Sequence, residues 1–305
     1  MTLASATQAQ VFSPVAVEIL ESLYQHRLLT GSQINQLHTP GRTLRWTRRI
    51  LTPLHEHGLI ARAGGPHNYA LWYLTDHGAD TIEAIWKRAE RRRRLSSPEQ
   101  AAGPLRAHTL AVNDVGIAFV QAARQREDEC GPLSWRHEIA HPISPARPRR
   151  PGELLVADAL LTYIQADGEQ SIVLHQRFIE LDRGTLPAEQ LAAKFTRYAR
   201  LREYRPATKQ GGAPARPLWT AYYRSFPSVL VVLADQSNAG ARRRIQRTIA
   251  LHNTDPERER HGSVPTLFVT LADLAAHGPF APVFIDLQNP GRYVDWLGPP
   301  QAEEE

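Results

Sequence analysis

The sequence has 305 residues, of which 42% are hydrophobic, and its formal net charge is +5. Its only cysteine, Cys130, excludes an internal disulfide and a four-cysteine zinc site. No apolar run approaches the ~20 residues that span a bilayer, and the first ten residues lack the features of a signal peptide, so we expect a cytoplasmic protein without a membrane partner.

The positive charge suits a polyanionic partner, although almost all of it is arginine, and that bias can equally reflect a GC-rich genome. The placement of the charge is more informative. Amphipathic patterns predict helices over Pro14–His26, Thr30–His38 and Arg42–His57. A hairpin follows, with strands Leu59–Ala63 and Tyr69–Leu74 around a glycine turn. Three helices and a hairpin in this order are typical of a winged helix-turn-helix domain.

The third predicted helix carries four arginines and only one balancing acid, Glu56. In winged helices the third helix enters the major groove, so we expect double-stranded DNA as the partner. The residues proposed to contact it are Arg42, Arg45, Arg48 and Arg49. The alternatives are a solvated helix face and a winged helix that docks on protein. A further helix, Thr75–Leu95, ends in the run Arg91–Arg94, which fits either a phosphate clamp or a solvated helix end.

Small, Pro and Gly residues cluster in Ser96–Pro104, which we interpret as a linker. Beyond it, the pattern predicts a helix over His108–Arg124 and a strand over Trp135–Ile143. Toward the C-terminus it predicts buried strands Ser228–Ala234 and Pro265–Leu271, separated by a helix with four clustered arginines, Ala239–Asn253. The acidic C-terminal end is expected to be disordered.

The central stretch, residues 154–204, predicts two strands and then a helix. Asp158 lies near the start of the first strand, and Glu180 and Asp182 end the second, spaced by two so that both point to one side of the sheet. Carboxylates within a buried sheet are costly unless they are paired or hold a cation. Mg²⁺ prefers such oxygens, and it can position a water for attack on a phosphodiester. We therefore predict a metal site of Asp158, Glu180 and Asp182. The structural alternative is that Asp182 forms an ion pair with the adjacent Arg183 and that Asp158 is a turn residue.

This pattern resembles nucleases of the PD-(D/E)XK, or restriction-endonuclease-like, fold. Asp158 matches the strand Asp of that fold, Glu180 matches its second acid, and Glu138 is a candidate for the acid on an earlier element. The lysine that the fold places two residues after Glu180 is Asp182 here. Lys194 lies on the inward side of the next helix, near Phe195 and Tyr198, so we expect it to supply the amine that steadies the scissile phosphate instead.

A second resemblance covers most of the chain. The succession of segments HTLAVNDV, WRHE, ADALL, FIELDRGT, LAAKFTRYARL and SVLVVLAD after the winged helix is similar to the replication-relaxation family of actinobacterial plasmids and mobile elements. That resemblance implies a role in replication, relaxation or transfer of plasmid DNA, with other replication or transfer proteins as partners and a homodimer as a candidate assembly.

Together these observations predict a two-domain α/β (α+β) protein. A winged helix-turn-helix domain would span residues 12–95, and a mixed-sheet nuclease-like domain residues 105–297, followed by the tail 298–305. The expected function is DNA binding with Mg²⁺-dependent nicking. The main alternative is a non-catalytic, sequence-specific DNA-binding initiator or regulator whose nuclease fold is degenerate.

Two other reaction types, zinc-dependent proteolysis and tyrosine transesterification, have candidate residues in the sequence. His137–His141 spells HExxH, the zinc-protease signature, which requires both histidines on one face of a helix. Pro142 follows at once, and in a strand the two histidines would share a face ~13 Å apart, too far to hold one zinc. Tyrosine transesterification has candidates by residue type, namely Tyr198, Tyr204, Tyr222 and Tyr223, but no three-histidine run accompanies them, and the spacing of Tyr198 indicates a core residue.

Overall fold

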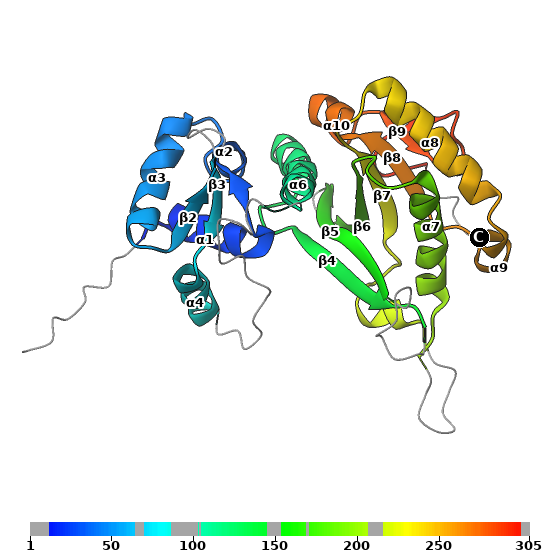
Figure 1. The fold of residues 1–305 in the computed structure, drawn as a ribbon, viewed down its shortest axis with the longest axis horizontal. Coiled ribbons are helices and arrows are strands. Elements are labelled where there is room, and N and C mark those ends of the chain that lie inside the picture. Colours follow the sequence, from blue (N-terminus) through cyan, green and yellow to red (C-terminus); the bar gives the residue numbers. More distant parts are fainter. Residues whose placement is uncertain are drawn as a thin grey trace, which may run out of the picture. The chain divides into compact units, whose positions relative to one another are not determined.

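The computed structural model describes residues 12–64, 70–86, 103, 105–144, 154–168, 171–206 and 216–299. The chain divides into two compact units, Met1–Arg106 and Ala107–Glu305, which Figure 1 colours from blue to red along the sequence. The predicted basic run Arg91–Arg94, nearly all of the linker Ser96–Pro104 and the acidic residues Glu303–Glu305 lie outside the described residues.

The first unit contains the predicted helices and hairpin, with one additional short strand. Its elements are α1 (Pro14–His26), β1 (Leu29–Thr30), α2 (Gly31–His38), α3 (Leu44–Glu56), β2 (Ile60–Ala63), β3 (Leu71–Leu74) and α4 (Asp76–Ile85). The strands form an antiparallel sheet in the order β1-β3-β2. Side-chain caps start several of the helices, including a capping box in which Thr30 and Gln33 bind each other's backbone N–H groups. Of the predicted helix Thr75–Leu95, residues Asp76–Ile85 are helical, and the residues after 86 lie outside the described part of the chain.

The turn between α2 and α3 is fixed by one side chain. The amide nitrogen of Asn35 donates to the Thr39 hydroxyl at 2.9 Å, to the Arg42 carbonyl at 3.0 Å and to the Thr47 hydroxyl at 2.9 Å. These bonds tie the end of α2 to the first turns of α3. On α3, Thr47, Leu51 and Leu54 face the core, so the opposite side of the helix is left to solvent.

The second unit is a mixed sheet between helices. Its elements are α6 (Arg106–Arg126), β4 (Trp135–Pro142), β5 (Leu154–Asp167), β6 (Ser171–Asp182), α7 (Ala188–Glu203), η1 (Leu218–Ala221), β7 (Ser228–Leu233), α8 (Asn238–Asn253), α9 (Pro256–His261), β8 (Thr266–Thr270), α10 (Leu271–His277), β9 (Phe284–Asp286) and β10 (Tyr293–Val294). The described part of the chain is therefore mixed α/β, as the sequence predicts.

The seven-stranded sheet has the order β10-β9-β8-β7-β6-β5-β4. The β6–β7 and β7–β8 pairs are parallel, and the other neighbours are antiparallel. Helices α7 and α8 make the parallel connections and cover one face of the sheet, whereas α6 lies on the other face (Figure 1). Phe178, Phe195, Tyr198 and Phe268 are fully buried in the core between the sheet and α7 and α8.

Strands β4 and β5 change faces at matching positions. Leu155 and Ala157 pack into the α7–α8 core together with Leu160, whereas strict alternation would turn Leu160 to the opposite side. On β4, the change coincides with Glu138, whose φ of 53° is left-handed and rare for a non-glycine residue in a strand. The register pairs His137 with Ala159 and Ile139 with Ala157, so Glu138 and Asp158 lie at the point of the change. In both strands, the regular alternation of side chains between the two faces of the sheet is therefore interrupted beside the predicted site.

None of the helices in the described part of the chain is long and apolar enough to cross a lipid bilayer.

Candidate functional site

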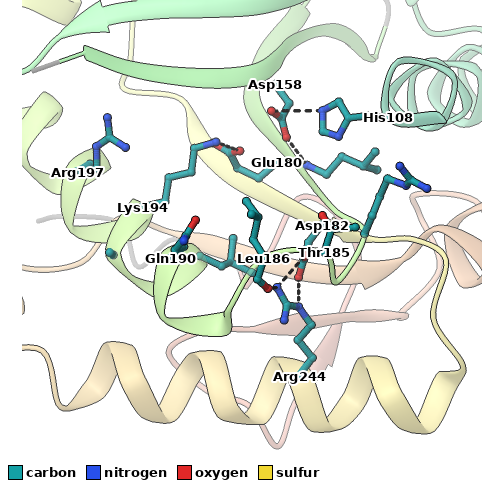
Figure 2. A pocket seen from close by; sticks show the side chains of 14 residues that line it. His108, Asp158, Glu180, Asp182, Thr185, Leu186, Gln190, Lys194, Arg197 and Arg244 are labelled. Atoms are coloured by element: carbon teal, nitrogen blue, oxygen red, sulfur yellow. Dashed lines mark hydrogen bonds and ion pairs between the residues drawn. The ribbon is translucent and has the colours of Figure 1, made fainter. Parts of the chain in front are cut away.

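The predicted acids lie around a pocket of about 440 Å³ in the second unit. Its walls come from the start of α6, the strands β5 and β6, the loop after β6, and the helices α7 and α8 (Figure 2). The charged residues that line it are His108, Asp158, Glu180, Asp182, Arg183, Lys194, Arg197 and Arg244. On α7, Gln190, Lys194 and Arg197 are spaced by four and three, which places them on the same face of that helix, above the strand ends.

Glu180 is the most deeply buried acid of the pocket, with 2% of its surface exposed. Its Oε2 accepts a hydrogen bond from Lys194 Nζ (Figure 2). Its Oε1 accepts one from the Tyr198 hydroxyl, and both donors come from α7. Burial raises the pKa of Glu180 to about 8. The positive charge of Lys194 acts in the opposite direction and lowers this pKa, whereas the negative charge of Asp158 raises it further. The structure thus brings Lys194 to the acid that the sequence associates with it.

Asp158 lies beside Glu180 and is held in its anionic form. The register of β5 and β6 pairs Ala159 with Ile179, so the next position brings Asp158 opposite Glu180. Its Oδ2 accepts from the backbone N–H of Leu181 at 2.8 Å, and its Oδ1 lies 3.4 Å from Nε2 of His108. Burial by itself would raise the pKa of Asp158, but the hydrogen bond from His108 and the charge of Lys194 outweigh it and lower the pKa.

Asp182 does not join the other two acids. The guanidinium of Arg244, on α8, binds both of its carboxylate oxygens, and the backbone N–H of Gly184 donates to Oδ1 at 2.9 Å. Arg244 also donates to the carbonyl of Leu186 at 2.7 Å and so fixes the loop after β6. Asp182 is therefore ion-paired, as the structural alternative holds, but its partner is Arg244, whereas Arg183 binds Asp235. The predicted part of Asp182 in a metal site does not fit this geometry.

The donor set suits a cation held by two carboxylates rather than three. Among the described residues, no group of three His, Cys, Asp or Glu side chains is placed to hold a metal ion. Mg²⁺ is commonly bound through one or two carboxylates, with waters and substrate phosphates completing its shell. Asp158 and Glu180 fit that requirement once Lys194 leaves Oε2 of Glu180. Glu138 is exposed and is absent from the pocket lining, so it supplies no third ligand.

The position of the HExxH segment in a strand contradicts the zinc-protease hypothesis. His137 and His141 lie in β4 and not in a helix. His137 Nε2 lies 3.0 Å from the Asn113 side chain of α6, whereas His141 Nε2 lies 2.6 Å from the Tyr223 hydroxyl, within the α7–α8 core. The expectation that a strand would put both histidines on one face is also wrong, because β4 changes faces at Glu138 between them.

Two of the tyrosines considered as nucleophiles, Tyr198 and Tyr223, are buried and hydrogen-bonded inside the second unit. Tyr198 is fully buried and donates its hydroxyl to Glu180, as expected for a core residue. Tyr223 is buried against His141. Burial raises the pKa of Tyr198 and that of Tyr223, the latter to about 12, and a raised pKa disfavours the phenolate that would attack DNA.

In the first unit, the predicted DNA-contacting arginines lie on and just before α3. Arg42, Arg45 and Arg49 are exposed, and Arg48 is half-buried. Trp46 is exposed among them, with the Arg42 guanidinium 5.8 Å from its ring centroid. The exposed side of α3 thus combines positive charge with one aromatic ring, and none of its arginines is packed into the core.

The family model described as replication-relaxation matches residues 20–215, nearly two thirds of the chain. The chain belongs to the replication-relaxation family. Membership points to a role in replication or relaxation of mobile elements. The matched region contains every acid of the pocket together with Lys194, whereas Arg244 lies beyond it. No curated protein and no solved structure matches the chain.

For this replication-relaxation protein, sequence reasoning missed several residues of the pocket, and two of them contact its acids. His108 lies in the first turn of α6, 50 positions before Asp158, and nothing in its surroundings in the sequence marks it as a partner of an acid. Arg244 belongs to an arginine cluster that the sequence shows plainly, but its pairing with Asp182 spans 62 positions. The sequence did show acids in buried strands, and a buried acid needs a positively charged partner. It did not show which residue that partner is.

Proposed function

We propose that this protein binds duplex DNA through its first unit and nicks DNA, with a divalent cation, at the pocket of Asp158, Glu180 and Lys194. The nick would serve replication, relaxation or transfer of a mobile element. The observation that carries the proposal is the contact between Lys194 and Glu180 beside Asp158. Two acids on neighbouring strands with an amine beside them are the groups that PD-(D/E)XK nucleases use, and here the amine comes from α7 instead of from the strand.

Each residue would have a defined part. Asp158 and Glu180 would hold Mg²⁺, which when bound stabilises charge that develops on a phosphodiester and lowers the pKa of a water. Lys194, released from Glu180, would place its ammonium against the phosphate and stabilise its negative charge. His108 would keep Asp158 oriented and anionic through their contact.

DNA binding would depend on the first unit. Its element order, with the hairpin β2–β3 following α3, supports a winged helix-turn-helix in which α3 enters the major groove. Arg42, Arg45 and Arg49 are exposed on or next to that helix and would contact phosphates or base edges.

The test is a nicking assay with supercoiled plasmid and Mg²⁺ or Mn²⁺. We expect the wild type to yield relaxed circles, and Asp158→Asn, Glu180→Gln and Lys194→Met to lose this activity while they retain plasmid binding in a gel shift. Glu203→Gln is the matched control, because it neutralises an exposed acid of α7 that lines neither the pocket nor the neighbouring groove. Plasmid that stays supercoiled with wild type under all cation conditions would contradict the nuclease.

One observation favours a second candidate, a DNA-binding initiator or regulator that does not cut. Both oxygens of Glu180 are already bound by protein donors, and Asp182 stands where the fold expects a lysine. Under this alternative, wild type and Asp158→Asn would shift DNA equally and neither would nick it. In both candidates, Arg45→Ala with Arg49→Ala would weaken duplex binding and reduce its salt dependence.

A further inference from the structure

A second groove lies beside the pocket, between the start of α7 and one side of α8. It has a volume of about 550 Å³ and is lined by Pro187, Ala188, Glu189, Arg243, Arg244 and Arg247. Among these six residues the single acid, Glu189, is bound to Arg247 at 2.6 Å. The lining therefore carries a net positive charge that its own residues do not neutralise.

Arg244 connects this groove to the pocket, because it lines both. Its guanidinium is held by Asp182 and by the Leu186 carbonyl, so it forms a fixed wall between the two hollows (Figure 2). Arg243 and Arg247, in contrast, are exposed. Two exposed guanidinium groups thus lie next to the pocket of the acids and Lys194. Arg247 is paired with Glu189, and a bound anion would share or displace that exposed ion pair.

The arginines are costly for the helix that carries them. Arg243 and Arg247 are four residues apart, so their like charges face each other along α8 and oppose helix formation. Arg242, Arg243 and Arg244 also lie in the second turn of α8, near the helix end that favours negative charge, and the first turn contains no acid. An anion bound along this side would remove both costs.

We propose that the groove binds the phosphodiester backbone of the DNA strand that enters the pocket, with Arg243 and Arg247 holding phosphates next to the one beside Lys194. The inference rests on the proposed function for the identity of that strand. Each strand of duplex DNA carries one phosphate per ~3.4 Å of helix axis, so a phosphate at Lys194 has neighbours that need cations close by. Guanidinium groups match phosphate oxygens two at a time, which suits this task better than a point charge.

The test measures binding without cleavage. A fluorescently labelled single-stranded oligonucleotide is titrated with full-length protein in EDTA, in an Arg45→Ala, Arg49→Ala background that weakens the first unit's contribution. We expect Arg243→Ala with Arg247→Ala to weaken binding about tenfold at low salt and to lower the slope of log K against log salt by about 1.4, the value for two lost phosphate contacts on a single strand.

The matched control is Arg260→Ala with Arg292→Ala, which removes the same charge at exposed positions outside the groove. A loss no larger than that of this control would overturn the inference. An unchanged DNA affinity, with a polyglutamate peptide bound only when Arg243 and Arg247 are present, would assign the groove to an acidic protein instead. Arg244 is left intact, because it holds the buried Asp182.

The outcomes separate this inference from the proposed nicking. If wild type never nicks plasmid but the groove variant loses oligonucleotide affinity and salt slope, the groove binds DNA and the nuclease proposal fails. If wild type nicks plasmid but the groove variant shows unchanged oligonucleotide affinity and unchanged KM for nicking, the nuclease proposal stands and the groove inference fails.

Discussion

Glu180 and Asp182 differ sharply although they lie two residues apart on one strand and on the same face of the sheet. Both are buried, at 2% and 8% exposure. Glu180 meets a lysine and a tyrosine from α7, and burial raises its pKa to about 8, whereas Asp182 is bound on both oxygens by Arg244 from α8. The spacing along the strand determines which side of the sheet an acid faces. The helix packed above the acid determines which side chains bind its carboxylate. A lysine on a flexible stem can turn to a substrate, but a bidentate arginine occupies the acid completely.

The largest effect is expected from Arg244→Ala. Removing this guanidinium leaves the buried Asp182 charge without its partner, which typically costs about 3–5 kcal/mol of unfolding free energy. Urea denaturation of the second unit measures the loss. Its neighbour Arg243→Ala is the control, since an exposed arginine should change stability by less than about 0.5 kcal/mol. Equal losses in the two variants would show that Asp182 does not depend on Arg244.

The raised pKa of Glu180 predicts a pH-dependent stability. An acid whose pKa is higher in the folded state binds more protons when folded, so its contribution is present below the unfolded pKa of about 4.3 and is lost as pH rises toward about 8. The unfolding free energy of wild type should therefore fall relative to that of Glu180→Gln over this interval. Urea titrations in EDTA at several pH values measure this, and parallel curves for the two proteins would refute it.

Asp158 stands opposite Glu180 and not opposite Asp182, and that placement coincides with the left-handed backbone of Glu138. A β-branched residue fits this conformation poorly, so Glu138→Val should lose about 1–2 kcal/mol, whereas Glu138→Gly should lose little. Arg136→Val, at an exposed position of the same strand, controls for the change of residue type. Thermal unfolding compares the three variants. If Glu138→Val were as stable as Glu138→Gly, the strain at this position would be disproved.

The smallest effect concerns the tyrosine that distinguishes Glu180 from Asp182. Tyr198→Phe removes one hydrogen bond to Glu180 without opening a cavity and should cost about 1 kcal/mol. If nicking is observed, its rate should fall modestly in this variant, because Lys194 and both metal-binding acids remain. Denaturation and nicking rates measure the two effects. A complete loss of nicking with normal stability would mean that the hydroxyl itself takes part in the reaction.

Sequence patterns were sufficient for the elements around the pocket. Apolar runs marked β5, β6, β7 and β8, and helical spacing marked α7 with Lys194 directed toward the strands. These features depend on local periodicity, which the residues themselves carry. The association of Lys194 with Glu180 was also accessible, because a short loop joins a strand end to the following helix.

The remaining features of the site depend on packing between distant segments. The spacing of two correctly placed Glu180 and Asp182 on one side, but their different partners come from separate helices. The face change at Glu138 broke the regular alternation that was assumed for His137 and His141, and no glycine or proline at that position announces it. His108 reaches Asp158 only because α6 begins beside β5. Tertiary contacts of this kind leave no periodic trace in the chain.

The origin of Lys194 on a helix makes the pocket sensitive to rotation as well as to distance. Each residue inserted into α7 ahead of position 194 would turn the remainder of that helix by about 100° and carry the ammonium away from Glu180. A lysine on the strand itself would be moved by an insertion only to the other face or along the sheet. In related chains, the number of residues between this acid and its amine should therefore vary less than the residues themselves do.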